Sequence, residues 1–598
     1  MKKILVLFAL LATTACAWSQ RDFELAEHYF QNGQYTEAKL YYDKLYNDGF
    51  EEEIFDNYLV TLTKLNEFKS AESLVKKRIK KTKEASLYID LGNLYLLEKK
   101  EADANQAFQE AIDKTQPYRL PILTLAKKFL DSYLNEWALK TYEKGQNQGK
   151  DGYSYAYEIA GVQGSLGKFQ EMLNSYLDIL KTDASYISQI EVTLMQLVDF
   201  EEDDARCQDI KGAILKRIQL EPTVSSYNEL LAWFLMQRMD FNGAFTQLNA
   251  LDKRNNENGN RLINLGTLAM NNKQYEVAQK CFAAVMAKGS SSVYYSQACL
   301  KNLQAMGLLL QDNPNASEQA YKDLDSQYSE ISKLNLQSNE MALLKRDWAH
   351  LKAFYLNDAP AAQTLLEEAL SLPGIPNKTK AEIKLELGDV YLFQGKIWDA
   401  SLLYSQIELD FRDDVIGHEA KFRNAKISFY TGDFDWAQGQ LDVLKASTSK
   451  LISNDALHLS LIITDNFNLD TTALPMQQFA RADLLLYQNR FNACLATLDS
   501  ITKEFPNHSL TDDILFEKAH IFERMHQIDS AYTCYNELVE IHFMGIYADD
   551  ALFRMAEIQD KYKQNPQEAH KLYDKILTDF PGSLYVLEAR KRYREFQP

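Results

Sequence analysis

The sequence repeats a short pattern at a nearly constant interval, and this repetition limits the possible folds more than any other feature. Its clearest copy is YIDLGNLYLLEKKEADANQAFQEAI at residues 88–112. Gly92 and Tyr95 fall within one turn of an expected first helix, while Ala104, Phe108 and Ala111 stand at positions i, i+4 and i+7 of a second helix. Gly92 and Ala104 are small where two backbones approach, and the aromatic rings fill the space beside them. The intervals therefore predict an antiparallel helix pair.

The small residue of the second helix recurs along almost the whole chain. It repeats at intervals of 33–34 residues in the first half and 37–38 residues in the second, at Ala38, Ala71, Ala104, Ala138, Met172, Ala244, Ala278, Ala362, Ala400, Ala437, Cys494, Ala531 and Ala569. This pattern resembles the tetratricopeptide repeat family. The resemblance implies an all-α fold, a tetratricopeptide-type α-solenoid in which antiparallel helix pairs form a superhelix. One pair buries too little apolar surface to fold alone, so neighbouring pairs must stack.

Changes in the repeat length predict the domain organisation. The motif fades after Gly289, and LLQDNPNASEQ at 309–319 carries the turn-forming residues expected at a junction. We therefore divide the chain into four parts. They are a signal peptide at 1–19, an N-terminal array of 33–34-residue units at 20–311, an irregular helical junction at 312–345 and a C-terminal array of 37–38-residue units at 346–598.

The first residues, MKKILVLFALLATTACAWS, have the features of a secretory signal. Two lysines precede an apolar run at 4–12, and small residues follow. The run is too short for a bilayer-spanning helix, which needs about 20 apolar residues. Small residues around Ala15 and Ala17 suit simple cleavage, which we favour. The alternative is a lipoprotein box at 13–16 in which Cys16 is acylated, although the first residue of this box is not the usual leucine.

Composition narrows the classes of partner. The formal net charge is −19, and such an acidic surface repels nucleic acid and anionic lipid. We therefore expect no nucleic-acid partner, and membrane association only if Cys16 is lipidated or through a partner. The other cysteines are few and scattered, which indicates buried small side chains rather than a disulfide framework: Cys207, Cys281, Cys299, Cys494 and Cys534.

The C-terminal units have a more particular sequence. EFPNHSLTDDILFEKAHIF recurs loosely as ADDALFRMAEIQ, and the chain closes with DFPGSLYVLEARKRYREF. These segments resemble the repeats of bacterial outer-membrane assembly lipoproteins and of the periplasmic factor that coordinates envelope constriction. The resemblance covers residues 475–598. Together with the signal peptide, it implies an exported protein of a Gram-negative bacterium, located in the periplasm or at the outer membrane.

Motifs that could carry chemistry have simpler structural interpretations. GVQGSLGK at 161–168 lacks the first glycine and the final Ser/Thr of a phosphate-binding loop, and its Gly167 matches the inter-helix turn at Gly33. The acidic pairs 512–513 and 549–550 each precede an apolar helix start, where they are expected to cap the helix. No cysteine or histidine spacing fits a zinc site. We therefore predict no catalytic, cofactor or metal site, and a protein that is not an enzyme.

The resemblance also implies where partners bind, because the first helices of tetratricopeptide repeats line a concave groove. Ala425, Ala482 and Ala519 take the packing positions of three first helices. The residues predicted to face the groove beside them mix charge with aromatic rings, which suits peptide recognition: Arg423, Lys426, Tyr430, Asp483, Tyr487, His520 and Arg524.

The predicted function is that of a non-enzymatic scaffold that binds peptide or helical segments of protein partners in the cell envelope. Two alternatives remain open. The chain could be a component of an export or outer-membrane assembly machine. It could also be a carbohydrate-binding protein or an enzyme whose site lies in the irregular centre.

Overall fold

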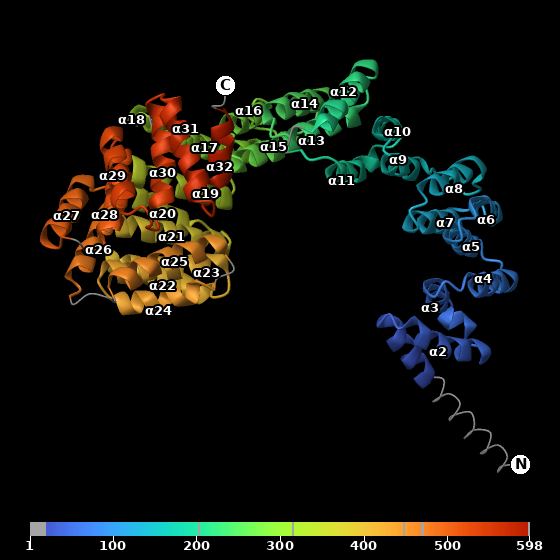
Figure 1. The fold of residues 1–598 in the computed structure, drawn as a ribbon. Helices are drawn as coiled ribbons and strands as arrows, with labels where there is room; N and C mark the ends of the chain where they lie inside the picture. The colour runs from blue at the N-terminus through green and yellow to red at the C-terminus, as the bar shows by residue number, and fades with distance from the viewer. Residues whose placement is uncertain are drawn as a thin grey trace, which may run out of the picture. The chain divides into compact units, whose positions relative to one another are not determined.

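The computed structural model describes residues 20–200, 204–313, 316–446, 449–467, 472–506 and 508–595. The predicted signal peptide, with Cys16, lies outside these residues. Within them the secondary structure consists of helices joined by turns, without strands (Figure 1). This arrangement confirms the predicted all-α fold.

Contacts divide the chain into two compact units, residues 1–247 and 248–598. The division falls inside α14 (Phe241–Arg254). It does not coincide with the change of repeat length near residue 312, so the predicted domain limits stay predictions. The segment 312–345 carries α18 and the start of α19, both regular helices.

The first unit consists of successive helix pairs, with one short 3₁₀ helix before α11. Its helices are 20–31, α2 (Tyr35–Asn47), α3 (Glu51–Lys64), α4 (Phe68–Thr82), α5 (Leu87–Leu97), α6 (Glu101–Lys114), α7 (Arg119–Asp131), α8 (Asn135–Gln148), α9 (Ala156–Ser165), α10 (Phe169–Thr182), η1 (Ala184–Tyr186), α11 (Ile187–Leu197), α12 (Ala205–Leu220) and α13 (Ser225–Gln237).

The second unit begins within α14 and includes two π-helical turns, η2 and η3. Its helices are α15 (Asn260–Asn271), α16 (Tyr275–Met286), α17 (Tyr295–Asp312), α18 (Glu318–Ile331), α19 (Ser338–His350), η2 (Leu351–Tyr355), α20 (Ala359–Ser371), α21 (Asn377–Phe393), α22 (Ile397–Asp410), α23 (Val415–Tyr430), α24 (Phe434–Leu444), α25 (Lys450–Asn466), α26 (Leu474–Tyr487), α27 (Phe491–Glu504), α28 (Thr511–Arg524), α29 (Ile528–Ile541), α30 (Ala548–Glu557), η3 (Ile558–Tyr562), α31 (Pro566–Asp579) and α32 (Val586–Glu595).

Close packing of a glycine on an aromatic ring explains the spacing of the repeat. A Cβ atom added to Gly92 would lie 2.2 Å from Cε1 of Phe108, and one added to Gly388 would lie 2.4 Å from Cε1 of Tyr404. Gly266 has the same relation to Phe282. Only glycine allows the two helices of these pairs to approach so closely. The small residues of the second helices, from Ala38 to Ala569, are all buried, which confirms the predicted helix register.

The glycine-containing segment at 161–168 consists of the last residues of α9 and the three-residue turn that follows them. It joins the end of α9 to the start of α10. Gly167 has a φ of +76°, and Gly33 at the equivalent turn has a φ of +70°. Glycine adopts this left-handed conformation without steric cost. The turn therefore accounts for the presence of Gly167, and no phosphate-binding function is required to explain it.

One carboxylate of each acidic pair makes an inter-repeat contact rather than a cap hydrogen bond, whereas Asp512 accepts from the backbone N–H of Asp513 at 3.1 Å in the first turn of α28. The N-cap of α28 is Leu510, without a side-chain cap bond. Asp513 is buried instead and accepts a hydrogen bond of 2.8 Å from the hydroxyl of Tyr547, which precedes the next first helix. Asp550 likewise accepts a hydrogen bond of 2.6 Å from the hydroxyl of Tyr585. The predicted capping is therefore wrong for these two carboxylates, although both lie in the first turn, where the helix dipole favours them.

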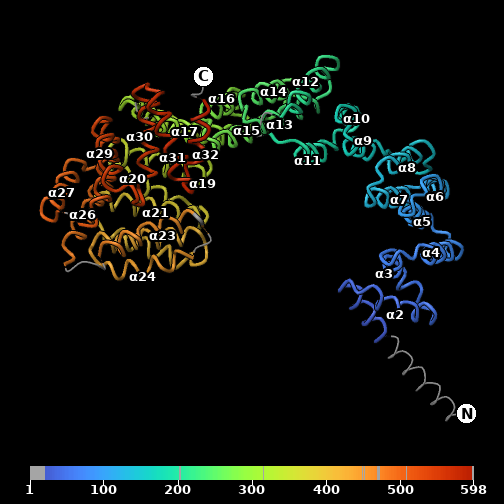
Figure 2. The backbone as a smooth tube through the Cα atoms, in the orientation of Figure 1, coloured from blue at the N-terminus to red at the C-terminus, as the bar shows by residue number. Residues whose placement is uncertain are grey.

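The second unit winds back on itself, so that repeats far apart in sequence touch. The backbone of this unit coils through successive helix pairs (Figure 2), and the end of α26 contacts the end of α21. The Tyr487 hydroxyl donates to the backbone oxygen of Asp389 at 3.3 Å, and the Gln488 amide donates to that of Leu392 at 3.2 Å. Asn489 similarly donates to the oxygen of Phe354 at 3.0 Å. These bonds close one turn of the superhelix around an inner face.

Candidate functional site

The seven residues predicted from the sequence lie on three first helices of the second unit. α23 carries Arg423, Lys426 and Tyr430; α26 carries Asp483 and Tyr487; and α28 carries His520 and Arg524. The packing positions beside them are confirmed, because Ala425, Ala482 and Ala519 are buried. Their use in partner binding stays a prediction.

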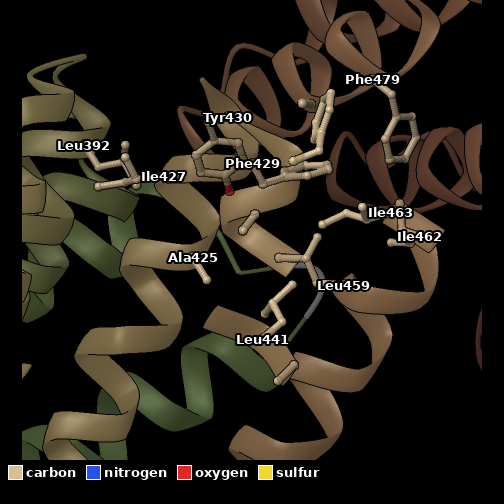
Figure 3. Packing of buried hydrophobic residues seen from close by; sticks show 14 of the residues in the cluster. Leu392, Ala425, Ile427, Phe429, Tyr430, Leu441, Leu459, Ile462, Ile463 and Phe479 are labelled. Atoms are coloured by element: carbon tan, nitrogen blue, oxygen red, sulfur yellow. The ribbon is translucent and has the colours of Figure 1, made fainter. Parts of the chain in front are cut away.

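Tyr430, which the repeat register predicted to face the groove, is buried. Only 8% of it is accessible, and it belongs to the hydrophobic cluster shared by α23 and α26. Figure 3 shows its ring among the buried side chains, next to Phe429. The expectation was wrong because α26 packs against α23 and covers the end of that helix. Tyr430 therefore contributes mainly to packing.

Arg423 and Tyr487 bond to the protein itself. Nε of Arg423 donates to Oδ1 of Asp389 at 2.9 Å, and its guanidinium also pairs with Glu419 one turn earlier. Tyr487 packs its ring edge-on against Phe354, with the centroids 6.1 Å apart. Arg423 thus links two neighbouring first helices, and Tyr487 helps to close the superhelical turn, so both side chains are engaged within the protein.

Lys426, Asp483 and Glu517 form a charged cluster further along the inner face. The Nζ atom of Lys426 lies 5.6 Å from the ring centroid of Tyr430. Burial, and next the charge of Asp483, raise the pKa of Glu517 to about 8. Burial also lowers the pKa of the neighbouring His520 to about 4, so that its ring is neutral at ordinary pH. Glu517, which stands three residues before His520 on the same helix, is not among the residues predicted from the sequence.

Arg524 is the exposed member of the predicted set. Its guanidinium donates to the side-chain oxygen of Asn489 and lies 4.8 Å from the ring centroid of Phe491. It lines a cavity of about 960 Å³ at the turns that join first and second helices, together with Tyr355 and Arg554. The lining of this cavity combines charged and aromatic side chains, as the sequence predicts for the groove.

A second cavity, of about 640 Å³, lies against first helices that the sequence analysis did not select. We call it the inner cavity; it is formed by α17, α19, α21 and α23, with Met270 of α15 and Tyr328 of α18. Neighbouring first helices in this set pack side by side. Its charged lining consists of Arg346, Asp347, His350, Lys378, Glu382, Glu386, Asp414, Glu419 and Arg423.

Ion pairs between successive first helices build the charged wall of the inner cavity. Arg346 of α19 donates through Nε to Oδ1 of Asp347 at 2.9 Å, and its Nη1 atom pairs with Glu382 of α21. One turn further, Nδ1 of His350 lies 2.8 Å from Oε1 of Glu386. Burial disfavours the charged form of His350, but the hydrogen bond with Glu386 and its charge outweigh this, so the pKa of His350 is raised above its ordinary value.

The sequence does contain a signal for this wall. Arg346 and His350, then Glu382 and Glu386, then Glu419 and Arg423 are pairs spaced i, i+4 that recur every 36 or 37 residues. This interval is close to the repeat length, so each pair stands at the same register of its first helix. The faded motif before residue 345 hid the first pair, which is why the sequence analysis missed the cavity.

Among the described residues, neither a metal-binding cluster nor a membrane-spanning helix is present. Across the part of the chain that the structure describes, three or more His, Cys, Asp or Glu side chains nowhere come together in an arrangement that could hold a metal ion. Among the same residues, every helix is too short or too polar to cross a membrane.

The architecture defines the class of protein as an α-solenoid scaffold built from stacked antiparallel helix pairs. Residues 550–583 match the family model of the tetratricopeptide repeat, and they cover α30, η3 and α31. Residues 550–583 are thus a tetratricopeptide repeat, and the same packing positions are occupied in the other units, so the fold is a tetratricopeptide-type α-solenoid. Repeats of this kind form surfaces for protein–protein interaction.

Comparison with solved structures returns other helical-repeat proteins. Yeast Tom70 is 16% identical, with a TM-score of 0.28 over 83% of this chain and 100% of that chain. A tetratricopeptide repeat protein from Parabacteroides merdae is 12% identical, with a TM-score of 0.26 over 50% of this chain and 98% of that one. Naa15/Naa10 bound to HypK-THB is 12% identical, with a TM-score of 0.27 over 96% of both chains. TM-scores this low carry no information about partners. No curated protein matches the sequence.

Proposed function

We propose that this chain is an exported, non-enzymatic scaffold of the Gram-negative cell envelope, which binds segments of protein partners on the inner face of residues 248–598. The observation that supports it best is the inner cavity, about 640 Å³ in volume and lined by both charged and apolar side chains of four first helices. A concave site with a few convergent polar groups is the usual form of a binding pocket. The larger cavity around Arg524 extends the available inner surface.

Site-specific photo-crosslinking in cells tests the binding face. A photoreactive amino acid at Lys378 or Arg524 samples the two cavities, and the same residue at Trp398 or Trp436 samples exposed positions on second helices. We expect the yield of protein adducts at the two cavity positions to be several times the yield at the two second-helix positions. Adducts that form only from Trp398 and Trp436 would place the binding surface elsewhere.

The location of the protein is tested at its N-terminus. The proposal expects mature protein outside the inner membrane, with the first residues removed by cleavage near residue 17 or residue 19. Fractionation of the envelope followed by mass spectrometry of the N-terminus measures this. A chain that keeps Met1–Lys3 would contradict export, and a diacylglyceryl group on Cys16 would make the protein an anchored lipoprotein instead of a cleaved one.

A further inference from the structure

We infer that the inner cavity is a pocket for a basic side chain, lysine or arginine, of the bound protein segment, with apolar neighbours of that side chain on its floor. This inference rests on the proposed function, because it names the chemistry of the segment that the scaffold binds. It follows from the way the charges of the cavity are paired, from its net charge and from its shape.

The cations of the cavity are already engaged by carboxylates. Arg346 uses all three of its guanidinium nitrogens on Asp347 and Glu382. Arg423 is shared between Glu419 and Asp389, and the Nζ atom of Lys378 lies 3.7 Å from Oδ2 of Asp414. An incoming acidic group would therefore have to break an existing pair to find a partner.

Carboxylate oxygens, in contrast, remain available. Glu382 accepts through Oε2, Glu386 through Oε1 and Glu419 through Oε1. In the described residues, the second oxygen of each of these three groups has no hydrogen-bond partner in the protein. Each carboxylate can accept further bonds, and ammonium or guanidinium groups donate the strongest of them.

The net charge of the cavity lining also favours a basic side chain. Five carboxylates line the cavity, from Asp347, Glu382, Glu386, Asp414 and Glu419, against the three cations Arg346, Lys378 and Arg423. Two negative charges are therefore in excess when His350 is neutral, and one is in excess when it is protonated. Partial enclosure between helices strengthens their attraction for a cation relative to bulk water. A basic side chain would neutralise this excess.

The remaining wall is apolar, which distinguishes the cavity from a surface patch of acids. Met270, Leu308, Leu385, Val415 and Ile416 line it beside the carboxylates. A volume of about 640 Å³ lies inside the range of ligand pockets and holds more than one side chain. The aliphatic stem of lysine or arginine can lie along such a surface while its charged end reaches the carboxylates. A basic residue beside a leucine-like residue fits both parts.

Selection from displayed peptides tests this specificity with the full-length protein. The probe is a library of random 12-residue peptides. Selected peptides are then synthesised with each lysine or arginine replaced by norleucine, citrulline or glutamate. The inference expects lysine and arginine to be enriched, and each replacement to weaken binding at least tenfold by fluorescence anisotropy at low salt. Enrichment of acidic or neutral peptides, or no selected peptide, would overturn it.

Variants of the wall connect the selected peptides to the inner cavity. Glu382→Gln with Glu386→Gln keeps the shape of the wall and removes two charges, and it should weaken binding of a selected basic peptide at least tenfold. Arg346→Gln removes a cation and should strengthen binding. Glu408→Gln is the matched control, because Glu408 pairs with Lys421 outside the cavity and should leave binding unchanged. Circular dichroism verifies that each variant is folded. Equal binding by the double variant and the control would overturn the assignment.

The two proposals can fail separately. If crosslinks from Lys378 persist in the double variant and the captured segment has no basic residue, the specificity is wrong and the scaffold function stands. If neither cavity position crosslinks to any protein, the proposed function itself fails.

Discussion

Replacement of Gly388 by alanine tests the packing rule that generates the whole array. The added Cβ would lie 2.4 Å from Cε1 of Tyr404, and 2.9 and 3.0 Å from two other ring carbons. The ring of Tyr404 is fully buried, and its hydroxyl donates to Asp389 at 2.7 Å. The ring cannot swing into solvent, so the helices α21 and α22 must separate or the ring must move by about 1 Å to reach an ordinary contact distance.

The magnitude follows from two opposing effects. Overpacking of a buried site costs about 1–3 kcal/mol, and the fixed ring places Gly388 at the upper end. Alanine in the helix interior is about 1 kcal/mol more favourable than glycine. The net expectation is a loss of about 2 kcal/mol in the local stability of the α21–α22 pair. Since 1.4 kcal/mol corresponds to a factor of ten, amide exchange through local opening should accelerate by about 30-fold.

Hydrogen–deuterium exchange with mass spectrometry measures this change in peptides from α21 and α22. The matched control is Gly439→Ala in α24, where an added Cβ meets nothing within 4 Å. That variant should exchange no faster than the parent protein, because only the favourable helix propensity remains. If Gly388→Ala gave the same protection as Gly439→Ala, the close glycine–ring contact would not be what sets the repeat spacing.

Three further predictions concern buried groups. The pKa of Glu517 is raised to about 8 from an ordinary 4.5, so its contribution to stability is complete below pH 4.5 and is lost as the pH rises through 8. Glu517→Gln should therefore melt at a higher temperature than the parent at pH 9 and at the same temperature near pH 4, and identical melting curves at pH 9 would refute this. Ala400→Glu forces a charge into a fully buried helix contact and should lower the free energy of unfolding by about 4 kcal/mol or more. Leu402→Glu, on the exposed face of the same helix, is the control and should change it by about 0.5 kcal/mol or less. Equal denaturation midpoints for the two variants would contradict the predicted register. Burial raises the pKa of the Cys281 and Cys494 thiols to about 12, so iodoacetamide at pH 8 should label them in urea and not in the native protein, as peptide mass spectrometry can verify.

The sequence alone determined the local architecture. The spacing of Gly92, Ala104 and Phe108 predicted the helix pair, and the structure places these residues in direct contact. Such a prediction succeeds because the contacts within a pair join residues of one short segment; Gly92 and Phe108, for example, stand 16 positions apart. Helical periodicity then fixes which face each residue occupies. The seven predicted groove residues were placed on the correct helices for the same reason.

Only the tertiary structure decided what those residues touch. Tyr430 became buried because α26 covers α23, and Tyr487 reached Asp389, 98 residues earlier, because the second unit closes a turn of superhelix. The inner cavity also depends on how Arg346, Glu382 and Glu419 of three successive first helices face one another. Each stacked pair adds a small rotation to the one before it, and the sum over several repeats sets the curvature. No single repeat encodes that sum, so the inner face could not be derived from the repeat pattern.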